Sequence, residues 1–304
     1  MDDGQTFPNA LTEMLPINRE LLMLMRPFVQ DASIQLHLAN RRKSHATRIH
    51  RNRRDYSVNR HGLHSFGATP HTIQLSPRNP AIANKPAGRF GGIGIASCNQ
   101  EVLDNSDIIV IAVRPPDARS ALSELRFRAD HQVISLVSGL LRRSLSELVA
   151  PATRITRAVP LPSSAKGLSP TAIVPPDRVA YDLFAILGTV FEVESEKEFD
   201  AMCATTATIA SYLAFIERIA SWLTQQGVRE SQAREYIARL FLGVTTTPVD
   251  TAQCSFQSLA ANHTTAGGIN EQFLKHLVEH GLLTSISEAL DAILHRISTE
   301  SLKA

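Results

Sequence analysis

The sequence predicts an α/β domain with a mainly parallel sheet, followed by an all-α domain. Short strands alternate with short helices between residues 73 and 175, the pattern of crossover units in a parallel sheet. Beyond Pro175-Pro176 the apolar residues recur at helical spacing instead. The composition agrees with a folded chain, because 43% of the 304 residues are hydrophobic and 20% are charged.

Composition also bears on location. The longest strongly apolar run, Ile108 to Val113, has six residues, whereas roughly 20 are needed to cross a bilayer. The chain begins Met-Asp-Asp without a basic region, so we expect neither a membrane span nor a secretory signal. Cys98, Cys203 and Cys254 stand far apart, which excludes a disulfide framework and suits the cytoplasm.

The first 72 residues differ from the rest. They carry ten Lys and Arg against six Asp and Glu, and seven of the basic residues lie between Arg41 and Arg54. A nucleic-acid-binding arm is one interpretation. A solvated, poorly ordered tail is favoured, because no aromatic residue lies within that stretch to stack on a base. We therefore treat residues 1–72 as an aberrant basic segment.

The α/β domain is expected over residues 73–175. A helix should run from Asp117, which can cap it, through Leu125, and Ser144 with Glu147 has the spacing of a capping box that opens another. The predicted strands are Thr72–Leu75, Ile93–Ala96, Ile108–Val113, Val133–Val137, Arg154–Ala158 and Thr171–Val174.

The helical domain is expected over residues 176–304. A second capping box at Ser195 and Glu198 opens a long helix that Gly227 ends. This helix is apolar over more of its circumference than a surface helix needs, so a partner subunit is expected to cover it. The other predicted elements are a helix at Arg178–Thr189, an edge strand at Val190–Val193, and helices at Arg229–Val244, Ile269–His280 and Ile286–Ile297.

Three motifs are set aside. Gly88–Gly94 is glycine-rich, but a strand follows it rather than precedes it, so we interpret it as a turn and not a phosphate loop. His276–His280 has the H-x-x-E-H spacing of a zinc helix, yet Gly281 ends the helix at once and no third ligand is evident. No metal site is expected. Ser138-Gly139 lacks the leading glycine of a nucleophile elbow, so a hydrolase has no support.

A polar turn follows the first predicted strand. In a doubly wound nucleotide fold this position meets the adenosine ribose, where an acidic residue selects NAD and an arginine accommodates the 2′-phosphate of NADP. The turn holds Ser76, Arg78 and Asn79, and no acidic residue lies between Thr72 and Arg89. NADP is therefore the predicted cofactor, with NAD second; an ordinary polar turn is the alternative.

Four ordered motifs resemble those of the pyrroline-5-carboxylate reductase family. Asn99 followed by Ser106–Pro115 is similar to the family's Asn and its Asp-apolar-Ala-Val-Lys-Pro strand. Val133–Gly139 is similar to its next strand, and Arg157–Pro160 to its Arg-apolar-Met-Pro. Thr265–Asn270 stands where the family has Ser-Pro-Gly-Gly-Thr-Thr at a helix start. The resemblance covers about residues 73–304.

The resemblance implies a Rossmann-like NADP-binding domain followed by a helical dimerisation and substrate domain, in a homodimeric reductase of a cyclic imine in proline biosynthesis. Bare N–H groups of Gly267 and Gly268 would bind the substrate carboxylate beside Asn270. The implied cofactor-binding residues are Ser76, Arg78, Asn79, Asn99, Ala112, Val113, Arg114, Pro115 and Pro160.

The departures from the family affect the substrate pocket. The paired threonines are Ile269 and Asn270, and residues 159–163 and 206–210 also differ from the family's motifs. A related imine or keto acid is therefore an alternative substrate, and a catalytically impaired cofactor-binding homologue is an alternative function. The β-hydroxyacid dehydrogenases are disfavoured, because they need a lysine on the long helix and none lies between Lys197 and Lys275.

The first strand and its glycine loop are missing from the expected place before Thr72. We predict that the segment from about Ile49 to His64 is written in a shifted reading frame. One permitted set of codons, read one base later, gives F-I-G-T-G-E-I-T-Q-S-I-V-T-A-F, which is a strand end, a G-x-G turn and a helix start. The two glycines require codons ending in G at Arg51 and Arg53.

Overall fold

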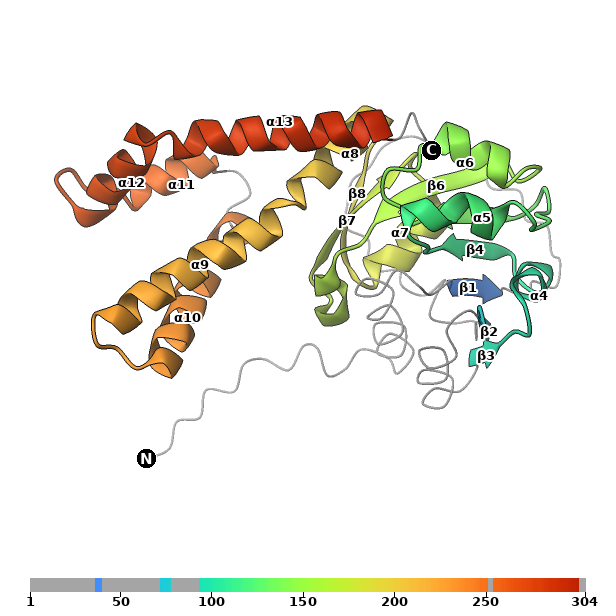
Figure 1. The fold of residues 1–304 in the computed structure, drawn as a ribbon, viewed down its shortest axis with the longest axis horizontal. Helices are drawn as coiled ribbons and strands as arrows, with labels where there is room; N and C mark the ends of the chain where they lie inside the picture. The colour runs from blue at the N-terminus through green and yellow to red at the C-terminus, as the bar shows by residue number, and fades with distance from the viewer. Residues whose placement is uncertain (1–35, 40–71, 78–92, 251–253, 301–304) are drawn as a thin grey trace. The chain divides into compact units, whose positions relative to one another are not determined.

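The computed structural model describes residues 36–39, 72–77, 93–250 and 254–300 (Figure 1). The chain divides into two compact units. One comprises Met1–Cys203 with Ser298–Ala304, and the other comprises Ala204–Ile297. Each unit is described by itself below. Residues 78–92, with Arg78, Asn79 and most of the glycine-rich stretch, lie outside the described residues, as does the segment from Ile49 to His64.

The first unit is built on an eight-stranded sheet in the order β3-β2-β1-β4-β5-β6-β7-β8. Strands β2, β3, β4, β5 and β6 run parallel to one another, while β1 and the β7–β8 pair run the other way. The strands are β1 (Leu36–Ala39), β2 (Thr72–Leu75), β3 (Ile93–Ile95), β4 (Ile108–Ile111), β5 (Gln132–Ser135), β6 (Arg154–Val159), β7 (Ser169–Val174) and β8 (Gly188–Glu192).

Hydrophobic side chains cover both faces of this sheet. Ile108 and Val110 of β4 join a buried cluster with Leu183 and Phe184 of α7 (Arg178–Ala185). Ile109 and Ile111, which alternate with them, join the opposite cluster, to which the helices α4 (Asn99–Asp104), α5 (Ala118–Leu122) and α6 (Arg142–Leu148) contribute. Burial on both faces is the reason that β4 is an unbroken apolar run, as predicted.

Several helix bounds differ from the sequence prediction. Pro115–Asp117 form a 3-10 turn, η1, before the short α5, and α4 was not predicted. Helix α6 begins at Arg142, so Ser144 lies inside it and the capping box predicted there is wrong; the Ser146 hydroxyl bonds the Arg143 carbonyl instead. Helix α7 ends before Gly188, whose positive φ of 145° begins β8.

The capping box at Ser195 is confirmed. The Ser195 hydroxyl accepts from the Glu198 N–H at 3.2 Å, and the Glu198 carboxylate accepts from the Ser195 N–H at 3.1 Å. The helix that it opens is α8 (Glu196–Thr205). The predicted single helix is divided here, since a second helix, α9 (Thr208–Gln225), follows after Thr206 and Ala207.

The sheet unit extends past the predicted boundary at 175/176. Because α7 and β8 pack on the same sheet as β7, the first unit continues to Cys203. The basic N-terminal segment also contributes to it, since β1 pairs with β2 and β4. The description of residues 1–72 as poorly ordered is therefore wrong for Leu36–Ala39.

The second unit is helical. Its helices are α9, α10 (Glu230–Asp250), α11 (Phe256–Asn262), α12 (Ile269–Glu279) and most of α13 (Leu282–Glu300). Helices α9 and α10 form a hairpin (Figure 1), in which Tyr212 and Phe215 contact the Phe241 ring edge-on. Gly227, with a φ of 94°, ends α9 as predicted. Large apolar side chains stay exposed in this unit, among them Leu213, Trp222 and Leu242.

One described stretch, Glu196–Gln225, is long and apolar enough to cross a membrane by length and composition alone. The expectation of no membrane span rested on shorter apolar runs and did not anticipate this. The core helix of a soluble protein satisfies the same criterion, so the stretch by itself does not indicate a membrane protein.

Candidate cofactor site and helix α12

The carboxyl ends of five parallel strands meet at one edge of the sheet. In open α/β sheets, ligands bind at this edge. The predicted cofactor-binding residues that the structure describes follow β2, β3, β4 and β6, and so lie along this same edge. They are Ser76, Asn99, Ala112, Val113, Arg114, Pro115 and Pro160.

Ser76 and Asn99 are in direct contact. The Ser76 hydroxyl, which is buried, donates to the Asn99 amide oxygen at 2.6 Å. Ser76 follows β2 and Asn99 begins α4, so the hydrogen bond joins the ends of two neighbouring strands. Since the amide oxygen accepts from the hydroxyl, the amide NH₂ group is the end that can donate to a ligand.

The turn after β4 offers a second polar group. Ala112 and Val113 are buried, whereas the Arg114 side chain is 68% exposed and pairs with Asp117 at 3.0 Å. Pro115 opens the 3-10 turn, which holds Arg114 and Asp117 close together. Half-buried Pro160 follows β6 at the same edge.

The middle of this edge does not fit the diphosphate of a dinucleotide. The diphosphate is normally held by a glycine turn that leads from a parallel strand into a helix. Strand β1 occupies the position between β2 and β4 but is antiparallel to both. In the described part of the chain no G-x-G turn follows a strand. Among the described residues, those predicted for the ribose and nicotinamide lie at this edge, and none forms a glycine turn for the diphosphate.

The start of α12 holds the residues predicted for the substrate. Gly267 has a φ of 73°, and at Gly268 a Cβ atom would lie 2.9 Å from the Thr265 carbonyl oxygen, so the turn requires both glycines. Their N–H groups are not bare, which corrects the expectation. Gly267 donates to the Glu271 carboxylate at 2.7 Å, and Gly268 donates to the Thr265 carbonyl at 2.8 Å.

Asn270 has a structural partner as well. Its side-chain NH₂ donates to the His263 carbonyl at 2.8 Å, so it ties the first turn of α12 back to the end of α11. The sequence comparison of Asn270 with a family threonine gave no indication of this bond. Sequence reasoning also missed Glu271, although its position within the first turn of a helix is a favourable one for a carboxylate.

A buried ionic cluster joins β6 to α8. The Arg157 guanidinium bonds the Glu196 carboxylate at 3.0 Å, pairs with the Asp200 carboxylate at 3.3 Å and lies 4.6 Å from the centre of the Phe199 ring. Its side chain is 2% exposed. Burial raises the pKa of Asp200, and the positive charge of Arg157 opposes that rise. The cluster fixes the start of α8 next to the strand that leads to Pro160.

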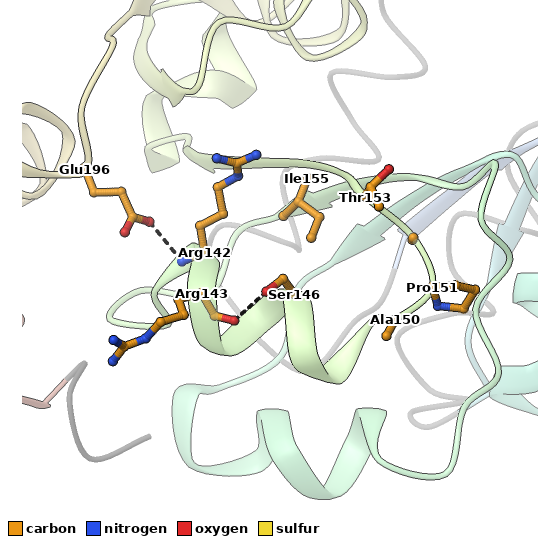
Figure 2. Close-up of a pocket in the computed structure, with 9 residues that line it drawn as sticks. Arg142, Arg143, Ser146, Ala150, Pro151, Thr153, Ile155 and Glu196 are labelled. Carbon is orange, nitrogen blue, oxygen red and sulfur yellow. Dashed lines mark hydrogen bonds between the residues drawn. The ribbon is translucent and has the colours of Figure 1, made fainter.

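A hollow lies along α6 and shares Glu196 with this ionic cluster. Figure 2 shows its lining, with the Arg142 N–H bonded to Glu196 and the Ser146 hydroxyl bonded to Arg143. Its volume is about 520 Å³. Ala150–Thr153, which precede β6, form one end, so the hollow extends toward the amino edge of the sheet. It contains none of the predicted cofactor-binding residues.

Metal binding finds no support in the part of the chain that the structure describes, where no group of three or more His, Cys, Asp and Glu side chains could hold an ion. The two histidines of the H-x-x-E-H motif stack on each other with ring centres 4.1 Å apart. The His280 Nδ1 atom also lies 2.7 Å from the His276 carbonyl oxygen, as is typical of a capped helix end.

Two sequence families match the chain. Residues 59–139 match the family described as NADP oxidoreductase coenzyme F420-dependent, and residues 196–300 match pyrroline-5-carboxylate reductase dimerisation. The pyrroline-5-carboxylate reductase 1 of Bacillus spizizenii is 29% identical over 208 residues, which are 66% of this chain and 70% of that protein.

Solved structures of pyrroline-5-carboxylate reductases have a similar fold. A pyrroline-5-carboxylate reductase from Coxiella burnetii has a TM-score of 0.67 at 24% identity, covering 79% of this chain and 92% of that one. A pyrroline carboxylate reductase from Plasmodium falciparum with NADP bound has a TM-score of 0.61 at 22% identity, covering 69% and 83%. At these identities the likeness establishes the fold.

The fold, the edge residues and the matches define an oxidoreductase with a Rossmann-like nucleotide domain followed by a helical dimerisation domain. The predicted fold class is confirmed. The matches support membership in the pyrroline-5-carboxylate reductase family, as the sequence motifs indicated.

Proposed function

We propose that the protein is a homodimeric, cytoplasmic reductase that uses NADPH to reduce a cyclic imine of the pyrroline-5-carboxylate type. The observation that carries the proposal is the alignment of Ser76, Asn99, Arg114 and Pro160 along the carboxyl edge of a sheet in a chain of this family. A related imine or keto acid is the alternative substrate.

The residues at the edge would bind and orient rather than react. A protonated imine is already a strong electrophile, so the protein needs to position it and exclude water rather than supply a nucleophile. NADPH, when bound, supplies the hydride. The Asn99 amide, held by Ser76, would donate to a ribose oxygen, and the Arg114 turn and Pro160 would line the nicotinamide side.

NADP is proposed over NAD. Ser76 ends the strand at which the adenosine ribose binds in this fold, and no acidic residue follows it before Arg89. Arg78 is the proposed partner of the 2′-phosphate. The related enzyme from Plasmodium falciparum was solved with NADP bound, which supports the choice.

The activity test is NADPH oxidation with a panel of cyclic imines and keto acids. Turnover of at least one cyclic imine is expected, and turnover of keto acids alone would replace the proposed substrate class. Arg78→Asp should reverse the preference for NADPH over NADH. Arg239→Asp is the matched control, because Arg239 is exposed on α10 of the other unit and should leave the preference unchanged.

The altered pocket motifs at residues 159–163, 206–210 and 269–270 favour a second candidate, a cofactor-binding homologue with impaired catalysis. NADPH binding without oxidation by any imine would select this candidate. Measuring NADPH binding and imine-dependent NADPH oxidation on the same sample therefore distinguishes the two functions.

A further inference from the structure

Strand β1, at the centre of the sheet, runs antiparallel to both of its neighbours. Leu36 of β1 lies opposite both Leu75 of β2 and Val110 of β4, and the strand is antiparallel to each of them. Since β2 and β4 end at the cofactor edge, β1 begins there, and its carboxyl end at Ala39 lies at the opposite edge.

This direction is incompatible with a diphosphate cradle. A cradle needs a strand that ends at the cofactor edge, a turn of glycines and a helix whose N–H groups point at the phosphates. Only one strand can lie between β2 and β4, and β1 takes that position. Among the described residues, no central strand is therefore parallel to β2 and β4.

The match to one known family begins within the segment from Ile49 to His64. The match to the NADP oxidoreductase family begins at residue 59, only about a dozen residues before Thr72. A strand, a turn and a crossover helix need more than about a dozen residues. The family match thus covers β2 and the elements that follow it, and it is too short before Thr72 to include a complete first βα unit.

We infer that this chain, as written, keeps the ribose and nicotinamide side of the site but lacks the diphosphate cradle, which its gene encodes one base out of frame near Ile49–His64. The shifted reading gives Phe-Ile-Gly-Thr-Gly-Glu-Ile, a strand end, two turn glycines and a helix start, directly upstream of β2. The inference rests on the proposed function for the identity of the cofactor.

The first test compares NADPH binding, measured by fluorescence titration, between the chain as written and a frame-restored chain. The restored chain carries the shifted reading in place of residues 49–63. We expect the chain as written to bind at least about 100-fold more weakly, because charge-assisted bonds to the diphosphate are lost. The control is the restored chain with both turn glycines changed to alanine. Its affinity for NADPH should fall toward that of the chain as written. Equal binding by the written and restored chains would overturn the inference.

The second test is the nucleotide sequence of the gene, which decides even if the restored chain fails to fold. Codons ending in G at Arg51 and Arg53 are expected, and any other third base there removes the two glycines and refutes the frame shift. A restored chain that binds NADPH tightly but reduces no imine would refute the proposed function and leave this inference standing. Imine reduction by the chain as written, with an affinity for NADPH equal to that of the restored chain, would refute this inference and leave the proposed function standing.

Discussion

The Glu271 carboxylate accepts a hydrogen bond from the Gly267 N–H at 2.7 Å, so the first turn of α12 carries an anion of its own. This position is the one at which family resemblance places a substrate carboxylate. The two carboxylates would compete for the same N–H group and for the same end of the helix dipole.

Removing that internal carboxylate should therefore favour substrates that bring one. For Glu271→Ala we expect the ratio of kcat/KM for a pyrroline with a ring carboxylate to that for the unsubstituted pyrroline to rise roughly threefold, in line with about 0.6 kcal/mol at a helix terminus. The assay uses the frame-restored chain. Glu279→Ala, at the other end of α12, is the control and should leave the ratio unchanged. An unaltered ratio in Glu271→Ala would show that the two carboxylates do not compete.

Arg157→Met should destabilise the first unit strongly. Loss of the guanidinium leaves the buried Asp200 carboxylate without its cation, and breaking a buried pair costs about 3–5 kcal/mol. Urea unfolding measures the loss. Arg178 on α7, whose side chain is 67% exposed where it pairs with Asp182, gives the control, since Arg178→Met should cost no more than about 1 kcal/mol. Similar losses in the two variants would contradict the structural role assigned to Arg157.

His131 should make stability depend on pH. The ring is fully buried. Its Nδ1 accepts a hydrogen bond from the backbone N–H of Arg128 at 3.1 Å, and its Nε2 lies 3.2 Å from the Leu103 carbonyl oxygen. Both contacts suit a neutral ring with the proton on Nε2. Burial, and then the charge of Arg128, lower the pKa of His131. The unfolded chain therefore binds a proton first as the pH falls below about 6.5.

The folded state should lose stability over that interval, by at most about 1.4 kcal/mol per pH unit, until the folded histidine is protonated too. Urea unfolding from pH 7.5 to pH 5 measures the slope, which His131→Leu should reduce. His263→Leu, at an exposed histidine of the second unit, should leave it unchanged. Equal slopes in the wild type and His131→Leu would assign the pH dependence to other groups.

Cys203 should resist thiol reagents in the folded protein. Burial raises the pKa of its thiol to about 12, whereas Cys98 and Cys254 are exposed. The thiolate is the reactive species, so only two thiols should react at neutral pH and the third should react after unfolding. Mass spectrometry after brief alkylation identifies them. Labelling of Cys203 at the rate of Cys254 would show that α8 opens readily from the sheet.

The strands between Thr72 and Val174 could be predicted from the sequence because burial on both sheet faces leaves apolar runs such as Ile108–Ile111. Strand β1 could not, because Leu36–Ala39 holds only two large apolar residues in a basic segment. The break between α8 and α9 was missed for a similar reason, since Thr206 and Ala207 contain neither glycine nor proline.

The candidate site, like the fold, was predicted from the sequence only in part. Ser76 and Asn99 were each expected at the cofactor edge from motif position, and the hydrogen bond between them follows from two strands ending together. The partners of Arg157 could not be foreseen, because Glu196 lies 39 residues further along the chain and only the packing of α8 brings it close. The contacts of Gly267 and Asn270 were missed because single-motif comparison assigns roles to residues and not to their neighbours.

The reversed β1 has a consequence for laboratory practice. Strands β2 and β4 each present a row of backbone donors and acceptors to the gap between them, and an extended segment of either direction satisfies those groups. A chain with such a segment therefore keeps the backbone hydrogen bonds of the sheet, to which circular dichroism responds. Quality control of a recombinant preparation must therefore include nucleotide affinity, because conformational assays alone cannot distinguish a competent enzyme from a well-folded substitute.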